Sequence, residues 1–245
     1  MKKLWMTSLV LVIVLLTSCG GKGISAEDAG ELFVDRLVYQ EEESTFAKEF
    51  RDGKKAGKEL DKNSQIFEES FAQGLSSAGA KVSKKEAKEL TKELLRQVKD
   101  KTTYKIVQVD EKKNGAEITY YVTGLDLVSA MKEMTRELVK DTLANPELAK
   151  DDQKTLDSTF SILKEQLQTI KVKTDPVALK VHLEKEKGKW FVPNDKKDEV
   201  SNLFMAFISG AKNSDTMNKE LQEAMNDVAK EIIDSIDKQP ILNNN

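Results

Sequence analysis

The sequence has one cysteine, one histidine and four prolines among 245 residues. A single cysteine excludes a disulfide within the chain, so the fold has to rest on its apolar core. One histidine without a cysteine pair or clustered carboxylates is a poor zinc donor set, and we expect neither a metal nor another cofactor. With few prolines and no Pro/Ser-rich linker, the chain is expected to form one domain.

A basic stripe is also missing. The 39 basic and 42 acidic residues are interspersed and give a net charge of −3. Nucleic-acid-binding proteins concentrate positive charge on one face, so we expect no nucleic acid as a partner. The mixture suits a soluble body held near a membrane.

Long hydrophobic runs are absent except at the start of the chain, where an apolar segment spans residues 4–16. This run is shorter than the roughly 20 residues of a membrane-spanning helix. Lys2 and Lys3 precede it, as in the positive n-region of a signal peptide. We therefore expect a signal peptide over residues 1–18.

The segment Leu16-Thr17-Ser18-Cys19 follows the apolar run and resembles the lipobox of bacterial lipoproteins. The resemblance implies cleavage after Ser18 and a diacylglycerol on Cys19, with acyl chains such as palmitate. The alternative, a secretory signal with an incidental cysteine, would carry a free thiol into an oxidising exterior. We expect a lipid anchor at Cys19, a short tether over residues 19–24, and a location on the outer face of the cell membrane.

The rest of the chain shows two hydrophobic periods. Helical spacing predicts helices after Ser25, around Phe46 and Phe50, and after the capping box at Ser83. Strand spacing predicts four strands, at about residues 103–109, 116–122, 177–183 and 190–192. Residues 54–63 contain too few apolar side chains to predict an element, and Pro146 is predicted to occupy the first position of a helix.

This order of elements favours an α+β fold with a curved antiparallel sheet of about four strands packed with helices. We expect one domain over residues 25–240, a helical insert over 125–172, C-terminal helices and a polar tail over 241–245. Alternation of apolar and polar residues predicts which side chains are buried and which are more exposed. The predicted buried set is Ile118, Val122, Val181 and Leu183, and the predicted exposed set is Glu117, Thr119, Lys180 and Glu184.

Two segments carry a family resemblance: TTYKIVQVDEKKNGAEITYYVTGLDL and VALKVHLEKEKGKWFVPND. With the lipobox and the early helix, they resemble uncharacterised lipoproteins of low-GC Gram-positive bacteria that have an NTF2-like (cystatin-like) extracellular domain. The resemblance implies a bent sheet wrapped around helices, whose concave side often forms an apolar pocket. It supplies no catalytic residues.

Aromatic residues on the predicted strands are the candidate ligand contacts. Tyr104, Tyr120 and Trp190 either line a pocket on the concave face or fill the core. His182 lies on the polar side of its strand and is interpreted as a surface residue.

We expect a non-catalytic, membrane-anchored module that binds a small apolar ligand or an envelope protein. The alternative is an envelope enzyme or folding factor that uses a carboxylate in an NTF2-like pocket. A two-lobed solute-binding lipoprotein would need more strands. A further alternative is that the signal segment VIVLLTS is released as a peptide pheromone, but nearly any lipoprotein signal would match this pattern.

Overall fold

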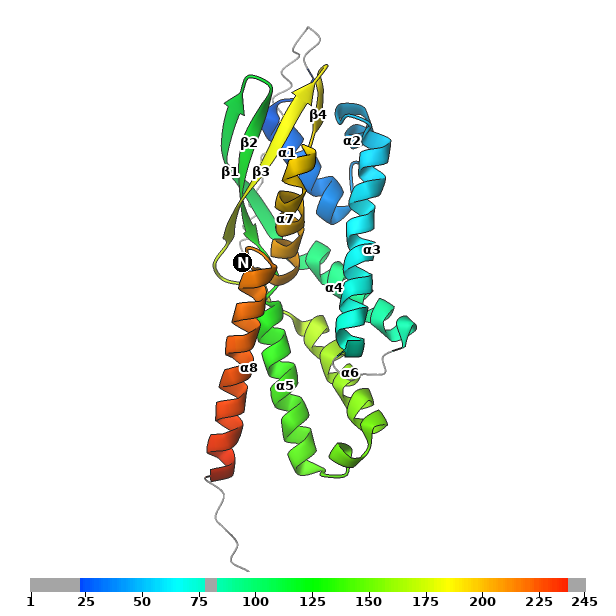
Figure 1. The fold of residues 1–245 in the computed structure, drawn as a ribbon, viewed down its shortest axis with the longest axis vertical. Coiled ribbons are helices and arrows are strands. Elements are labelled where there is room, and N and C mark those ends of the chain that lie inside the picture. The colour runs from blue at the N-terminus through cyan, green and yellow to red at the C-terminus, as the bar shows by residue number, and fades with distance from the viewer. Residues whose placement is uncertain (1–22, 78–82, 238–245) are drawn as a thin grey trace, which may run out of the picture.

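A computed structural model describes residues 23–77 and 83–237 (Figure 1). The signal peptide, Cys19 and the predicted tail over 241–245 lie outside the described residues. Four strands form one antiparallel sheet in the order β1-β2-β3-β4, and the sheet is curved and open. The strands are β1 (Thr103–Lys112), β2 (Gly115–Thr123), β3 (Val177–Glu186) and β4 (Lys189–Phe191). The predicted α+β fold is confirmed.

The first helices cover one face of the sheet. Helix α1 (Ala26–Val34) contacts β1 and β2, and it continues into a π-helical turn, η1 (Asp35–Tyr39). The short helix α2 (Glu43–Glu49) follows. Gly30 allows the close approach of α1, because a Cβ there would lie 2.8 Å from atoms of both Ile118 and Tyr120. Helix α1 therefore lies directly on the buried face of β2.

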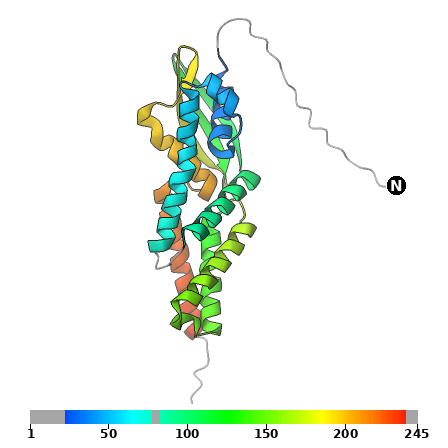
Figure 2. The same ribbon diagram turned by 90° about the vertical axis from the view of Figure 1, so that its right-hand side faces the viewer.

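Two helices cross the structure outside the sheet. Helix α3 (Gly53–Ser77) runs along the molecule from the level of α2, and α4 (Lys84–Lys101) contacts both α3 and α6 (Figures 1 and 2). Ser83 caps α4 as predicted: its hydroxyl accepts the N–H of Glu86, whose carboxylate in turn accepts the Ser83 N–H. The first half of α3 covers the segment for which the sequence predicted no element.

Helix α5 (Leu127–Ala144), a 3-10 turn (Leu148–Lys150) and α6 (Asp152–Thr169) lie between β2 and β3 in the chain. The prediction that Pro146 begins a helix is wrong. Asp151 is the N-cap of α6 instead, because its carboxylate accepts the N–H groups of Gln153 and Lys154. Asn145 accepts the N–H of Leu148 in a local turn.

Another 3-10 turn (Asn194–Lys196) leads from the sheet into α7 (Lys197–Ser209), which packs against β2 and β3. Gly210 ends α7 in the left-handed region, at φ 62°. Helix α8 (Ser214–Asp237) then runs beside α5. We call the sheet with α1, η1, α2 and α7 the sheet body, and α5, α6 and α8 the helical arm. The two lie at opposite ends of an elongated molecule (Figure 1).

The structure confirms most of the predicted alternation of buried and exposed residues along β2 and β3. Ile118, Val122, Val181 and Leu183 are all buried, while Lys180 and Glu184 are exposed and Glu117 is partly exposed. Thr119 was predicted to be more exposed, and this is wrong, since only 8% of it is accessible. Thr119 lies on β2 between two neighbouring strands, and it pairs with Gln108 of β1 and Lys180 of β3. The longer side chains of these two partners cover its short side chain.

The edge strand β1 is irregular. The pairing of β1 with β2 shifts between Ile106 and Gln108, which leaves the intervening Val107 48% exposed. Such a bulge bends the strand and interrupts its row of backbone hydrogen-bonding groups. Over residues 23–77 and 83–237, no helix combines the length and the apolar character that a membrane span requires.

Candidate ligand-binding groove

The three aromatic residues predicted from the sequence lie in or beside the core. Tyr120 is completely buried, and its hydroxyl donates to the carbonyl of Gly30 at 3.0 Å. Trp190 is 4% exposed and donates its indole N–H to the carbonyl of Ile24 at 3.1 Å. The rings of Tyr104 and Tyr120 lie 6.1 Å apart, whereas Trp190 lies on β4. The burial of Tyr120 and Trp190 fits the interpretation of these side chains as core residues.

A groove of about 580 Å³ lies between α3 on one side and β4 with the start of α7 on the other. Apolar and polar side chains contribute to its lining in nearly equal number. The lining residues are Phe33, Phe46, Phe50, Arg51, Asp52, Lys55, Ala56, Glu59, Leu60, Lys62, Ile66, Phe191, Val192, Asn194, Lys197, Val200 and Ser201. Large apolar contact area beside a few polar groups is typical of ligand sites.

Stacked aromatic rings form part of the groove. The rings of Phe46 and Phe50 stack at 4.1 Å, and Phe33 stacks on Phe50 at 6.1 Å. The spacing of Phe46 and Phe50 places both on one face of α2 and its C-cap. Phe50 also forms a parallel bridge with Trp190, and the Arg51 N–H donates to the Trp190 carbonyl at 2.8 Å. These contacts hold the end of α2 against β4.

The charged residues of the groove are mostly basic. Four of the lining residues are basic and two are acidic: Arg51, Lys55, Lys62 and Lys197 against Asp52 and Glu59. The guanidinium of Arg51 lies 3.5 Å from the ring centroid of Phe191 and forms an ion pair with Glu186 at 2.7 Å. Arg51 thereby covers an aromatic side chain at the sheet end of the groove.

Helix α3 is held beside the sheet body by a buried arginine. Arg36, on the π-helical turn, is 5% exposed. Its Nη2 atom donates to the Gly57 carbonyl at 3.2 Å and to the Asp61 carboxylate at 2.6 Å. Farther along α3, the rings of Phe67 and Phe204 meet edge to face at 6.2 Å. The wall of the groove is therefore fixed both by a charged contact and by an aromatic contact.

A second concavity of about 550 Å³ lies between α5, the segment 171–175 and α8. Lys132, Lys173 and Asp227 are among its lining residues, and the aromatic residues of the first groove have no counterpart in it. Ion pairs of Lys132 with Asp227 at 2.9 Å and of Lys173 with Glu220 at 2.5 Å cross this region. Four of its charged lining residues already pair with each other and no aromatic side chain lines it, which makes it the weaker candidate for a ligand site.

Two carboxyl groups near the π-helical turn have altered acidity. Burial raises the pKa of Asp35 above its ordinary value, and the hydroxyl of Tyr104 donates to Asp35 at 3.1 Å. Burial likewise raises the pKa of Glu31. Burial, followed by the neighbouring charge of Asp35, raises the pKa of Tyr104 well above its usual range. Neither Asp35 nor Tyr104 is among the residues lining the two concavities.

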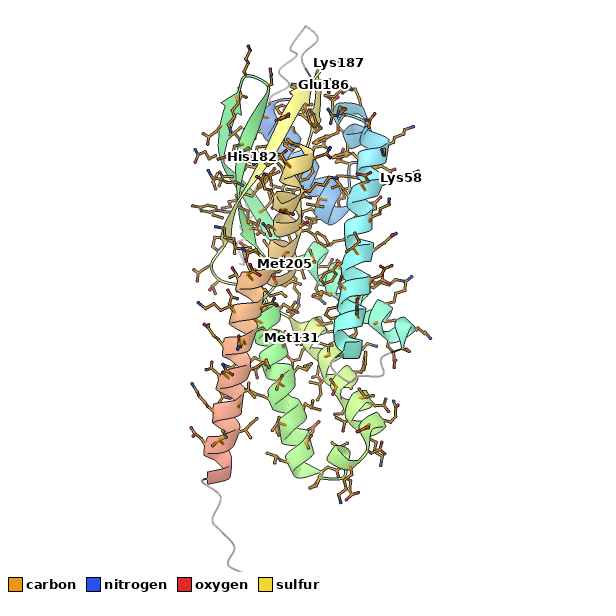
Figure 3. All side chains as sticks on the ribbon, in the orientation of Figure 1. Lys58, Met131, His182, Glu186, Lys187 and Met205 are labelled. Atoms are coloured by element: carbon orange, nitrogen blue, oxygen red, sulfur yellow. The ribbon has the colours of Figure 1, made fainter. Side chains whose placement is uncertain are left out.

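His182 contacts two carboxylates on the outer side of the sheet (Figure 3). Its Nε2 atom lies 2.7 Å from Glu117, and its Nδ1 atom lies 2.9 Å from Glu199. Glu199 also accepts the backbone N–H of His182 at 2.9 Å. The cluster joins α7 to the sheet. In the part of the chain that the structure describes, no group of three or more His, Cys, Asp or Glu residues is placed to hold a metal ion.

The profile of a protein family described as a domain of unknown function (DUF5105) matches residues 16–208. The chain belongs to the DUF5105 family. The matched range includes Cys19, the sheet and the groove residues, and it ends before α8. The groove is therefore part of the DUF5105 domain.

Among solved structures, the chain is similar to a protein of Bacillus subtilis described as a candidate lipoprotein (ycdA). The TM-score is 0.53 at 14% identity, and the match covers 74% of this chain and 55% of that one. This chain thus spans little more than half the length of that protein. A likeness at this identity shows the fold alone. No curated protein matches the chain.

The DUF5105 groove was missed in the sequence because its two sides come from distant segments. Phe46 and Phe50 were recognised as a helical pair, and Phe191 as part of a strand. The opposing wall, however, comes from the part of α3 that has few apolar residues. The one local signal was the pair of phenylalanines at positions 46 and 50, which lies close after Phe33 in the sequence.

Proposed function

We propose that this DUF5105 protein is a non-catalytic lipoprotein, anchored on the outer face of the cell membrane through Cys19, whose groove binds a small apolar ligand. The single observation that carries the binding proposal is the groove itself, with stacked phenylalanines at its base. The lipobox sequence, the inclusion of Cys19 in the family match and the structural likeness to a candidate lipoprotein support the anchor.

The basic residues of the groove narrow the chemistry of the ligand. An apolar body would contact Leu60, Ile66 and Phe191, which are at least partly exposed, above the buried phenylalanines. An anionic group would lie near Lys55 and Lys197. We further propose that the sheet and helices form an NTF2-like domain, in which the groove corresponds to the ligand-binding side. The curved antiparallel sheet packed with helices supports this assignment.

Binding is tested by a thermal-shift titration of the full chain with decanoate, an apolar chain that carries one negative charge. A ligand of the native state raises the melting temperature by mass action. Ser201 lies exposed on α7 at the groove, so Ser201→Trp should fill the groove and abolish the shift. Ser161 is an exposed serine on α6, and Ser161→Trp should keep it.

The proposed contact between the anionic group and a lysine of the groove is tested with a variant and a matched control. Lys55→Glu should weaken decanoate binding, because it places a negative charge at the groove. Lys58 lies one turn away on α3 and is not a lining residue, so Lys58→Glu should bind as the wild type does (Figure 3). An unchanged thermal shift in both Ser201→Trp and Lys55→Glu would contradict binding in the groove.

The anchor is tested separately by growth with labelled fatty acid. We expect label in the wild-type protein and none in Cys19→Ala. Label in the Cys19→Ala protein would show that another residue carries the lipid.

A carboxylate-based enzyme is the second candidate, and Asp35 is the observation that favours it. Burial raises the pKa of Asp35, as general acids require, and a tyrosine hydroxyl contacts it. Reproducible turnover of an envelope substrate by the wild type, lost in Asp35→Asn while the melting temperature is retained, would replace the non-catalytic proposal.

A further inference from the structure

The two hairpin turns of the sheet lie together at the end where the described chain begins. The Lys185 N–H donates to the carbonyl of Asn114, which joins the β3–β4 hairpin to the β1–β2 turn. Gly23 packs so closely on this end that a Cβ there would lie 2.6 Å from the Gly188 carbonyl oxygen. The Lys185 ammonium and the Trp190 indole both donate to the Ile24 carbonyl at 3.1 Å. We call residues 111–114 and 184–189 the hairpin end.

The position of Gly23 limits the distance between the hairpin end and the lipid. Cys19 precedes Gly23 by four residues, so even a fully extended chain spans only about 14 Å between them. This step rests on the proposed anchor at Cys19. If that anchor holds, the hairpin end is the part of the sheet body nearest to the bilayer.

The charges of the molecule differ along its long axis. The hairpin end contains five lysines and three glutamates. Glu186 pairs with Arg51. The lysines at the two turns of this end, Lys113 and Lys187, are exposed and form no ion pair among the described residues. At the opposite end, α8 contains seven carboxylates and two lysines. An anionic surface would attract the first end and repel the second.

We propose that the hairpin end docks on anionic phospholipid headgroups, so that the domain stands upright with the helical arm directed away from the membrane. Lysines near an anionic leaflet strengthen association by roughly fivefold each. Lys113 and Lys187 are placed to do so, since both are exposed in turns that the hydrogen bond from Lys185 to Asn114 holds together, at the end where Gly23 packs.

The test uses the lipidated chain in phosphatidylcholine vesicles, with or without phosphatidylglycerol, that contain a headgroup-labelled quencher lipid. Acylation occupies Cys19, so one introduced cysteine is the only site for a fluorophore. Asn114→Cys places the fluorophore at the hairpin end, and Asn145→Cys places it in the exposed loop between α5 and α6. Flotation with the vesicles reports the anchor independently.

We expect the Asn114→Cys label to be quenched more strongly than the Asn145→Cys label, and phosphatidylglycerol to widen the difference. Lys113→Glu with Lys187→Glu should lower the ratio of docked to undocked protein by about 25-fold or more, from roughly fivefold for each lysine. The control, Lys140→Glu with Lys230→Glu on the helical arm, should not lower it. Salt near 1 M, where the Debye length is about 3 Å, should abolish the effect of phosphatidylglycerol.

Two results would overturn the proposal. Equal quenching of the two labels in floated vesicles would mean that the domain has no fixed orientation, with the anchor intact. A difference that neither phosphatidylglycerol nor the charge reversals alter would assign the orientation to the tether alone. A chain that does not float has no lipid anchor, and that result removes the proposed function and the orientation together.

Discussion

The sheet body and the helical arm bury their apolar residues to different degrees. Ile118, Val181, Leu203 and Phe207 of the sheet body are all fully buried. On the arm, Leu163 and Leu167 are buried as well. Leu138 and Leu156, however, are only partly buried, and Leu143 is 55% exposed. Ion pairs such as those of Lys132 with Asp227 and of Arg136 with Glu231 join α5 to α8. The body is held mainly by hydrophobic packing, whereas the arm depends more on half-exposed contacts.

This difference matters for function because the groove lies between the sheet body and α3 and does not involve the arm. Its phenylalanines belong to elements that pack on the sheet, so the site is largely formed before a ligand arrives. The family match includes α5 and α6 of the arm and leaves out only α8, so α8 is the part of the arm that lies outside the DUF5105 domain.

The largest effect is expected from Val181→Asp. Val181 is fully buried in the sheet body, so the change places an unpaired carboxylate in an apolar core. We expect a loss of several kcal/mol in the free energy of unfolding, measured by denaturant titration. Ala178→Asp, at an exposed position of the same strand, is the control and should cost much less. Equal losses would show that the register of β3 is wrong.

The contrast between the regions is measured by one substitution in each. Leu203→Ala removes a fully buried side chain from α7 and should cost about 3 kcal/mol. Leu138→Ala removes a partly buried one from α5 and should cost about 1 kcal/mol. Denaturant titration compares the two free energies of unfolding. A larger loss for Leu138→Ala would reverse our assignment of the more tightly packed region.

The ion pairs of the arm should contribute little individually. The guanidinium of Arg136 donates to both carboxylate oxygens of Glu231, at 2.7 and 2.5 Å, and both side chains are partly exposed. We expect Arg136→Ala to lower the free energy of unfolding by about 0.5 kcal/mol at low salt and by less at high salt. Lys140→Ala, which removes an exposed pair within α5, is the control. A loss that salt does not reduce would indicate packing of the arginine stem instead.

The smallest effect is expected from the acidity of Asp35. Burial raises its pKa in the folded state, so the folded state favours the protonated form. The associated stability is present below the ordinary pKa of 3.8 and is lost as pH rises through the raised folded-state value. Asp35→Asn should lack this pH-dependent loss, as seen in melting temperatures across acidic pH. Asp234→Asn on α8 should keep it, and identical pH profiles for all three proteins would contradict the burial of Asp35.

The sequence was sufficient to predict the elements that repeat a clear period. The alternation around Ile118 and Val181 gave the strands and their buried face, and Ser83 gave the start of α4. The parity rule was wrong for Thr119, because burial there depends on the length of side chains on neighbouring strands. The alternation of apolar and polar residues along one strand carries no information about the side chains on the neighbouring strands.

The groove was beyond local patterns for a similar reason. Its wall on α3 is positioned by Arg36, whose contacts with Gly57 and Asp61 join segments 21 and 25 residues apart. Arg36 is buried although it carries a charge. A charged residue that is buried against a backbone carbonyl has no distinguishing pattern in one sequence.

The contacts of His182 bear on whether copies of this protein can join through the edges of their sheets. Strand β4 pairs only with the last residues of β3, so the backbone N–H of His182 lies at an open edge, where the Glu199 carboxylate accepts it. The bulge beside Val107 interrupts the other edge. Free edges are where sheets from separate molecules join and aggregate. The Glu199 contact and the bulge each interrupt one of these edges, and both features disfavour strand addition between neighbouring copies.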